Sequence, residues 1–283
     1  MADSALDAER RARAALTYLP PDRARTRRIH RHGPVAVWEM IAGRYPGVDP
    51  GRLLEPDTAD GWRLIIPGDP GWPATLEVTG RPLGLWALGG GNLAALLARA
   101  VTLTGARAGS AYGRAVAAAL ATDLTAPLNT GTPVTVVAHG GGDGADVAAL
   151  TAATHQPGVG VVAVLDTNTD LFHRYDLLTA VASAGAVVSA AAPGAYPMPG
   201  HVAARIDLLA TLAHAVVLVE AGPGDDDALS VTYTARYRRR RPVLAVPGPI
   251  TAPASAGPHV LLRDGTARCV TTAADITAHL PQS

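Results

Sequence analysis

The sequence contains no lysine, so all 24 of its basic residues are arginine, and 24 acidic residues balance them. A formal net charge of +0 gives the chain no overall attraction to nucleic acid or to an anionic membrane. Any nucleic-acid site must therefore be a local patch. Arginine suits such a patch because its planar guanidinium offers a fork of donors that matches phosphate oxygens.

Cysteine and aromatic residues are also scarce. The single cysteine, Cys269, excludes an internal disulfide, and its apolar neighbours predict that it is buried. Aromatic residues make up 4% of the chain, so binding of single-stranded nucleic acid would depend on arginine and backbone amides rather than on stacking. His139 and His155 stand too far apart to pair as metal ligands, and we expect neither a metal nor a cofactor.

Long apolar runs are missing as well. The segment 159–165 falls well short of the roughly 20 residues that a membrane-spanning helix needs. The first residues include Asp3, Asp7 and Glu9, where a secretory signal has an uninterrupted apolar segment. These features predict a cytoplasmic protein with no membrane partner.

The chain is long enough for about two domains, and 48% hydrophobic residues supply a sizeable core. Residues 1–50 read as a small helical domain. Ser4 and Asp7 resemble a capping pair for a helix over 5–16, and a Gly-Pro pair at 33–34 precedes a further helix. Residues 51–81 read as a connector in which 64–66 is the only strand-like run.

From residue 82 to 283, short β-branched runs alternate with alanine-rich helical segments. This alternation is typical of a parallel sheet covered by helices on both faces. The sequence therefore predicts an α/β fold, a Rossmann-like doubly wound and mostly parallel sheet preceded by the helical domain. The expected strands are residues 83–87, 101–104, 134–137, 159–165, 186–189, 215–219 and 242–246.

Two basic runs stand out, residues 10–31 and residues 236–241. The first carries eight arginines, but Asp7, Glu9 and Asp22 are interspersed with them or adjoin them, so a solvated helical face is favoured over a nucleic-acid contact. The second run precedes Pro242 and is typical of a solvated helix end that the helix dipole favours.

In doubly wound sheets, ligands bind beyond the carboxyl ends of the strands. The loop 105–113 follows one predicted strand, and its glycines permit close backbone approach while Arg107 offers a fork for phosphate. It does not fit the G-x-G-x-x-G pattern of dinucleotide-binding proteins. An anion site and a turn whose glycines serve packing alone both remain open for this loop.

A second loop follows the strand 134–137 and contains Gly140, Gly141, Gly142 and Gly144. So many glycines are costly unless the backbone bends sharply or presses against a ligand, and we favour a ligand loop here. Asp146 falls in the first turn of the next helix, where it is able to cap that helix.

A third strand end carries Glu220, which is able to hold a ribose hydroxyl or to accept from loop amides. The triplet 225–227 is all aspartate, and a solvated loop and helix start is favoured there over a cation site. Its three negative charges would repel phosphate. Ser110 and Ser189 lack the G-x-S-x-G elbow and have no evident partners, so no hydrolytic site is indicated.

Taken together, the motifs resemble those of the DNA-processing protein A (DprA/Smf) family in its actinobacterial form. The resemblance covers nearly the whole chain and is carried by the segments 69–73, 82–86, 105–113, 188–194, 219–222, 241–249, 254–257 and 261–265.

The resemblance implies a sterile-alpha-motif-like helical front end and a Rossmann-like domain that binds single-stranded DNA. It further implies a homodimer that loads a RecA-type recombinase during natural transformation and is not an enzyme. Matched position by position, it predicts a DNA- and phosphate-binding set of ten residues: Gly105, Arg107, Ser110, Gly113, Gly140, Gly141, Gly144, Asp146, Arg205 and Glu220.

The chain departs from the family pattern at several positions beside this set. An Arg-Asn-Arg triplet of the family falls on Arg205-Ile206-Asp207, and an Arg-Ser-Gly segment falls on 225–227, which is Asp-Asp-Asp here. Leu150 stands where the family has histidine. Losing cations and gaining carboxylates is expected to weaken phosphate binding.

Two alternatives to DNA binding follow. One is a nucleotide-derivative sensor or phosphoribohydrolase-like enzyme, whose P-G-G-x-G-T-x-x-E loop is faintly matched by 222–224 after Glu220. The other is a diverged paralogue that keeps the fold and the dimer but has exchanged DNA for another partner.

Overall fold

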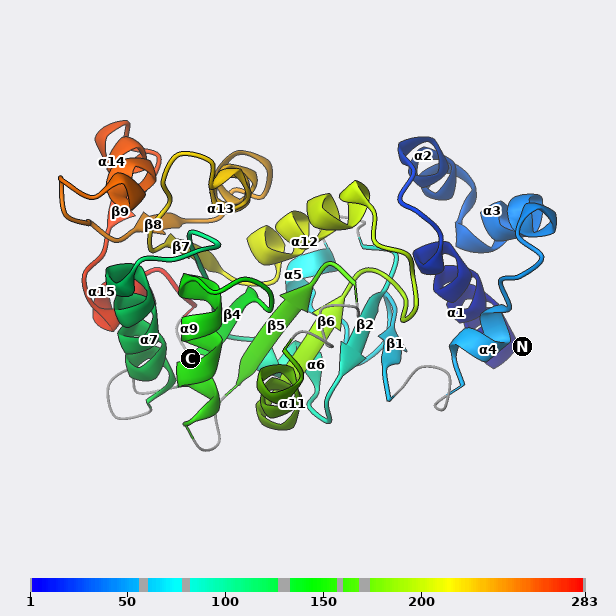
Figure 1. The fold of residues 1–283 in the computed structure, drawn as a ribbon. Helices are drawn as coiled ribbons and strands as arrows, with labels where there is room; N and C mark the ends of the chain where they lie inside the picture. Colours follow the sequence, from blue (N-terminus) through cyan, green and yellow to red (C-terminus); the bar gives the residue numbers. More distant parts are fainter. Residues whose placement is uncertain are drawn as a thin grey trace.

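The computed structural model describes residues 2–55, 61–77, 82–126, 133–156, 160–167 and 174–281. A helical unit lies at one end of a long twisted sheet, and most of the remaining helices cover the two faces of that sheet (Figure 1). The helical unit consists of α1 (Ala2–Tyr18), α2 (Arg23–His32), α3 (Pro34–Ile41), the 3₁₀ turn η1 (Ala42–Arg44) and α4 (Pro50–Leu53).

Local sequence signals set the helices of this unit. Asp22 caps α2 by accepting from the backbone N–H groups of Ala24 and Arg25, and Gly33 ends it with a φ of 82°. The predicted third helix is confirmed as α3, with Pro34 in its first turn. The expectation that Ser4 precedes the first helix is wrong, because α1 begins at Ala2.

The helical unit has a small core of its own and is anchored to the sheet. Leu16, Leu19, Ile29, Val37 and Ile41 form this core. On the face of α1 toward the sheet, Arg10 pairs with Asp69 (Nη2 to Oδ1, 2.7 Å), and the indole N–H of Trp86 donates to Thr17 Oγ1 at 2.9 Å. These buried and half-buried contacts fix α1 on the edge of the sheet.

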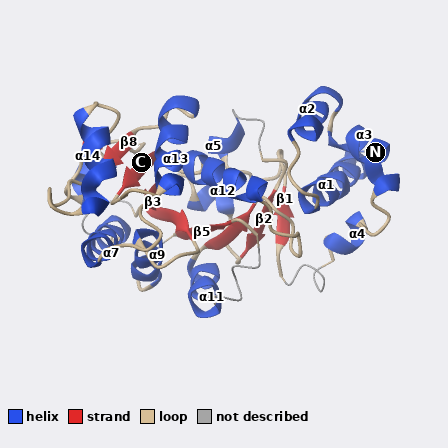
Figure 2. Cartoon of the chain, turned by 45° about the horizontal axis from the view of Figure 1, so that its top comes forward, coloured by secondary structure: helices blue, strands red, loops and turns tan. Residues whose placement is uncertain are grey.

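Among the described residues, the sheet has nine strands in the order β1-β2-β6-β5-β4-β3-β7-β8-β9. Figure 2 shows the strands in red between the surrounding helices. From β6 through β5, β4, β3, β7 and β8 to β9, neighbouring strands are parallel. At the other end of the sheet, β1 pairs antiparallel with β2, and β2 pairs antiparallel with β6. The bounds are β1 Arg63–Ile65, β2 Leu85–Leu88, β3 Ala100–Thr104, β4 Thr135–His139, β5 Val161–Leu165, β6 Ala186–Ser189, β7 Ala215–Leu218, β8 Val243–Ala245 and β9 Arg268–Cys269.

The remaining helices occupy the connections between strands. They are α5 (Ala74–Glu77), α6 (Leu93–Leu96), α7 (Ala111–Thr125), α9 (Ala145–Thr154), α11 (Tyr175–Ala184), α12 (Pro199–Thr211), α13 (Asp226–Tyr233), the π-helical turn η2 (Thr234–Arg238), the 3₁₀ turn η3 (Pro253–Ser255), α14 (Ala256–Arg263) and α15 (Ala273–Thr277).

Two cores sandwich the sheet. In β3, Val101 and Leu103 face the core formed with α7, α9 and α11, whereas Ala100 faces the core formed with α12 and α13. Because both faces are buried, the central strands are continuous apolar runs such as β5. This explains why all seven expected strands are confirmed, with small shifts at their ends, as β2 to β8. Of the expected 159–165 strand, Val159 lies outside the described residues.

The expected connector 51–81 contributes to the sheet domain. Its strand-like run forms β1 in register with β2, and Trp62, Trp72 and Leu76 are buried in the two cores. The domain boundaries at residues 50 and 81 remain a prediction. The expectation that Cys269 is buried is wrong, because β9 is the last strand of the sheet and both its residues are exposed.

Along the described stretches of the chain, every helix is too short or too polar to cross a membrane.

Candidate functional site

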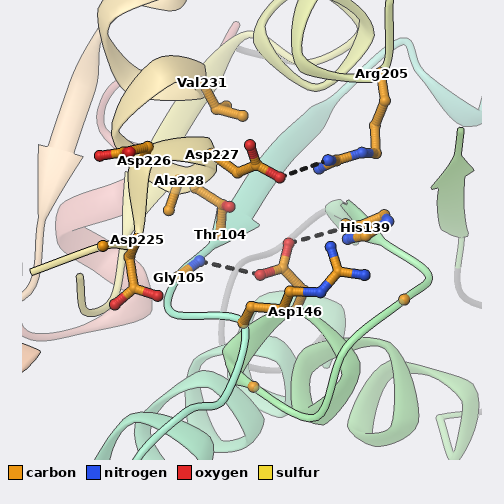
Figure 3. A pocket seen from close by; sticks show the side chains of 14 residues that line it. Thr104, Gly105, His139, Asp146, Arg205, Asp225, Asp226, Asp227, Ala228 and Val231 are labelled. Carbon is orange, nitrogen blue, oxygen red and sulfur yellow. Dashed lines mark hydrogen bonds and ion pairs between the residues drawn. The ribbon is translucent and has the colours of Figure 1, made fainter. Parts of the chain in front are cut away.

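A cavity of about 310 Å³ opens beyond the carboxyl ends of β3 and β4 (Figure 3). The loop between β3 and α7, the loop between β4 and α9, helix α12 and the start of α13 enclose it. The residues that line it are Thr104, Gly105, Arg107, His139, Gly141, Gly144, Asp146, Arg205, Gly224, Asp225, Asp226, Asp227, Ala228 and Val231.

The two glycine loops press directly against each other. A Cβ at Gly144 would lie 1.7 Å from the carbonyl oxygen of Ala106, and a Cβ at Gly109 would lie 2.6 Å from the Cα of Gly144. The N–H of Asp143 donates to the carbonyl of Arg107 at 2.9 Å across the same contact. Close packing of backbone on backbone therefore accounts for these glycines, and it places both loops at the cavity rim.

Asp146 ties the two strand ends together. Its carboxylate accepts from the backbone N–H of Gly105 at 3.0 Å and of His139 at 3.1 Å (Figure 3). Both bonds bridge between elements, so Asp146 holds the two loops in register in addition to occupying the first turn of α9. Burial raises the pKa of Asp146 to about 6.

His139 lies deep in the same cavity. Its side chain is buried, and its Nε2 has no hydrogen-bond partner among the described residues. Burial, together with the positive charges of Arg205 and Arg107, holds the pKa of His139 well below 6.5. The imidazole is therefore neutral near pH 7 and presents an unused polar atom at the cavity wall.

The buried imidazole makes stability fall in acid. The pKa of His139 is depressed in the folded state, so its contribution to stability is present above pH 6.5 and is lost as the pH falls below it. Relative to His139→Gln, the free energy of unfolding of the wild type should fall by up to about 1.4 kcal/mol per pH unit between pH 6.5 and 5.

Urea unfolding across this pH range measures the difference in free energy of unfolding between the wild type and His139→Gln. The effects of titrating carboxyl groups cancel in this difference because both proteins contain them. The exposed His155 supplies the control variant His155→Gln. If the difference in free energy of unfolding between the wild type and His139→Gln stays constant with pH, then His139 is protonated equally easily in the folded and the unfolded protein, which contradicts the prediction.

Arg205 reaches the cavity from α12 but is fully engaged by two carboxylates. Its Nε lies 2.8 Å from Asp166 Oδ1, and its Nη2 lies 2.7 Å from Asp227 Oδ2. The arginine side chain is 3% exposed, whereas that of Asp227 is 47% exposed. Asp227 therefore covers the guanidinium from the cavity side and takes up its capacity for a phosphate.

Among the described residues that line this cavity, Arg107 is the cation that remains available. It is exposed, and it forms no ion pair or side-chain hydrogen bond with any residue that the structure describes. Asp225, Asp226 and Asp227 line the same cavity. Asp225 accepts from the N–H of Gly222 at 2.8 Å, and the other two lie in the first turn of α13. Asp226 is exposed, as expected of a solvated helix start, whereas Asp227 is bound to Arg205.

The remaining predicted site residues lie beneath the cavity. Ser110 caps α7 by accepting from the N–H of Gly113 at 2.9 Å, and its hydroxyl donates to Glu220 at 2.6 Å. Glu220 also accepts from the N–H of Ser110 at 2.6 Å and is 2% exposed. A Cβ at Gly113 would overlap its carboxylate, and one at Gly140 would lie 2.5 Å from Leu165.

The structure thus brings six of the ten predicted residues to the cavity wall: Gly105, Arg107, Gly141, Gly144, Asp146 and Arg205. Ser110, Gly113, Gly140 and Glu220 support the loops from behind. Sequence reasoning missed Asp166, although it directly follows β5 and a polar residue at a strand end is the signal that points to a site. The described residues contain no group of three or more potential metal ligands.

The sheet topology and the cavity at the strand ends define a Rossmann-like α/β protein with a small helical unit on its first edge. Residues 63–281 match the family model described as DNA recombination-mediator protein A. The chain belongs to this family, the DprA family of DNA-processing proteins.

Curated relatives agree with this assignment. A putative DNA processing protein DprA of Mycobacterium tuberculosis is 40% identical over an alignment of 233 residues that covers 76% of this chain and 57% of the relative. The DNA processing protein DprA of Streptococcus pneumoniae is 30% identical over 191 residues, 66% of this chain and 64% of that protein. The chain therefore spans less than two thirds of the length of these relatives.

Two solved structures have the same fold. The X-ray structure of DprA from Streptococcus pneumoniae matches with a TM-score of 0.71 at 26% identity, covering 89% of this chain and 84% of that one. DprA from Helicobacter pylori, whose structure was described for its single-stranded DNA binding mode, matches with a TM-score of 0.61 at 20% identity. That match covers 73% of this chain and 91% of the other.

Proposed function

We propose that this protein binds single-stranded DNA at the cavity beyond β3 and β4 and acts as an accessory factor in recombination. Arg107 carries the proposal, since it is exposed, has no partner among the described residues and lies in the cavity lining at the strand ends. The Helicobacter pylori relative, which binds single-stranded DNA, and the family membership support it.

The charges around the cavity set the affinity for a single strand and its dependence on salt. Arg107 shares the cavity lining with Asp225, Asp226 and Asp227, and Arg205 is neutralised by Asp166 and Asp227. A strand bound here gains few phosphate contacts, so we propose a modest affinity that falls gently with salt. Each phosphate contact to a single strand contributes about 0.7 to the slope of log affinity against log salt.

Fluorescence anisotropy with a labelled single-stranded oligonucleotide and a duplex of the same sequence tests this proposal. Titrations at about 50 and about 200 mM salt should show binding that prefers the single strand and weakens as salt rises. Equal affinity for both forms, or no binding at the lower salt, would remove DNA as the ligand.

The finer parts of the proposal concern partners. We infer a homodimer, and a RecA-type recombinase that the dimer helps to load onto the bound strand. Analytical ultracentrifugation tests the dimer, with a single species of twice the chain mass as the expected result. The rate at which recombinase filaments form on the strand, with and without this protein, tests the loading, and an unchanged rate would contradict it.

We also propose that the protein is not an enzyme. The phosphoribohydrolase-like alternative needs a free acidic residue, but Glu220 is buried and bonded to Ser110. No observation favours that alternative. Incubation with nucleoside monophosphates should release no free base. Release that depends on Glu220 would support the phosphoribohydrolase-like alternative instead.

A further inference from the structure

The two basic runs of the sequence meet at a second cavity. This cavity has a volume of about 650 Å³ and lies between the helical unit and the sheet domain, where the end of α1 and the start of α2 face α12 and the end of η2. Arg23 and Arg25 line it from one side, and Arg238 and Arg239 line it from the other. From sequence alone each run matches a solvated face, but in the structure residues of both runs line one space.

The charge of this cavity is positive. Asp22 and Asp207 are the only acidic residues of its lining, and both are already bound. Asp22 caps α2, and Asp207 accepts from the guanidinium of Arg239, with Nε to Oδ1 at 3.1 Å. Arg25 donates to the carbonyl of Pro20.

Two arginines of the rim are left without partners. Arg23 and Arg238 are exposed and form no ion pair or side-chain hydrogen bond within the part of the chain that the structure describes. Guanidinium groups in this state bind phosphate oxygens with paired N–H donors.

The floor of the cavity has a different character. Leu16, Leu19, Ile29, Leu83 and Leu208 form an apolar surface beneath the arginine rim. A nucleotide matches this arrangement, because the flat face of its base fits an apolar surface and its phosphate fits the arginines. The cavity volume lies within the roughly 300–1,000 Å³ of small-ligand sites.

The walls are held in place before any ligand arrives. Thr17 lies in the lining, and its hydroxyl oxygen accepts from the indole of Trp86, which is fully buried in β2. Thr17 also accepts through its carbonyl from the N–H of Ala192 at 3.1 Å. Pro21 and Gly200 touch so closely that a Cβ at Gly200 would lie 2.5 Å from Pro21 Cβ.

We propose that this interdomain cavity is a second nucleotide-binding site, in which Arg23 and Arg238 hold the phosphate and the apolar floor receives the base. The nucleotide is free or is a unit of the strand bound at the first cavity. Helix α12 separates the two cavities, with Arg205 facing one and Asp207 facing the other. Binding of a nucleotide unit of the DNA strand rests on the proposed function, whereas binding of a free nucleotide does not.

The test compares Arg23→Ala/Arg238→Ala with a control of equal charge, Arg31→Ala/Arg263→Ala, whose exposed arginines lie on α2 and α14 outside the cavity. Two probes are used, a labelled oligothymidylate by anisotropy and thymidine monophosphate by calorimetry.

For the oligothymidylate, losing the one phosphate contact that the two arginines share lowers the salt slope by about 0.7. Raising salt from about 50 to about 200 mM should therefore cost the wild type about 2.6-fold more affinity than it costs the variant. For thymidine monophosphate, binding to the wild type that is lost in the variant and kept in the control assigns a free nucleotide. Either result supports the site.

The site is overturned if the double variant matches its control with both probes, or if the wild type binds neither. Arg107→Ala separates this failure from that of the proposed function. If oligothymidylate binding responds to Arg107→Ala but not to Arg23→Ala/Arg238→Ala, and no thymidine monophosphate binding is lost in the double variant, the second site alone is rejected. Binding that responds only to the double variant rejects the first cavity as the DNA site.

Discussion

Asp227→Asn is expected to strengthen binding of a single-stranded oligonucleotide about tenfold at low salt, because it removes one of the carboxylates at the cavity rim. It also loosens the hold on the Nη2 of Arg205, which now donates to Asp227 at 2.7 Å, because a neutral amide oxygen binds a guanidinium less strongly than a carboxylate does. Arg205 keeps its 2.8 Å pair with Asp166, so the change leaves no buried charge without a partner. Anisotropy at about 50 mM salt measures the gain, which should shrink as salt rises.

Glu39→Gln is the matched control for this change. Glu39 is exposed on α3, away from the cavity, and its substitution removes the same single negative charge. The control should leave the affinity unchanged. If Asp227→Asn binds no more tightly than Glu39→Gln, Asp227 does not limit access to Arg205.

Gly144→Ala is expected to lower the free energy of unfolding by about 3 kcal/mol. The added Cβ would lie 1.7 Å from the carbonyl oxygen of Ala106 and 3.2 Å from that of Arg107. Both neighbours are backbone atoms, so relief requires the two loops of the cavity to separate. Because those loops form the proposed DNA site, the variant should also lose affinity for the single strand.

Urea unfolding at pH 7 checks the loss of stability. Gly90→Ala is the control, since nothing lies within 4 Å of the added Cβ and the φ of Gly90 is not in the left-handed region. This control should change stability by no more than about 0.5 kcal/mol. A Gly144→Ala protein as stable as Gly90→Ala would mean that the loops do not pack as closely as the structure has them.

The central sheet was predictable because burial on both faces leaves a plain pattern in the sequence. Strands such as β5, with the sequence Val-Val-Ala-Val-Leu, are apolar throughout and are bounded by glycine or polar residues. The short β9 carries no such pattern, since Arg268 and Cys269 are exposed and pair on one side only. Its position depends on β8, which no local feature of residues 268–269 reveals.

The position of the cavity was predictable, because ligands bind beyond the carboxyl ends of parallel strands. The ion pairs within the cavity were not predictable. Gly105, Arg107 and Gly144 follow two strands that are neighbours in the sheet, so their meeting follows from topology. The engagement of Arg205 by Asp166 and Asp227 joins three segments that are separate in sequence. Such a contact depends on how α12 and α13 pack, and residue order does not specify that packing.

The same limit applies to the basic runs. Each run by itself matches a solvated helix face, and only the docking of α1 on the sheet edge through Thr17 and Trp86 brings Arg23 and Arg238 to one cavity.

The most direct test of the DNA site is the affinity of Arg107→Ala for a labelled single-stranded oligonucleotide, set against Arg263→Ala, an exposed arginine on α14 away from the cavity. We expect Arg107→Ala to weaken binding about fivefold and to lower the salt slope by about 0.7, the value for one phosphate contact to a single strand. Arg263→Ala should bind as the wild type does. Equal affinities and equal salt slopes for both variants would contradict the placement of DNA at the Arg107 loop.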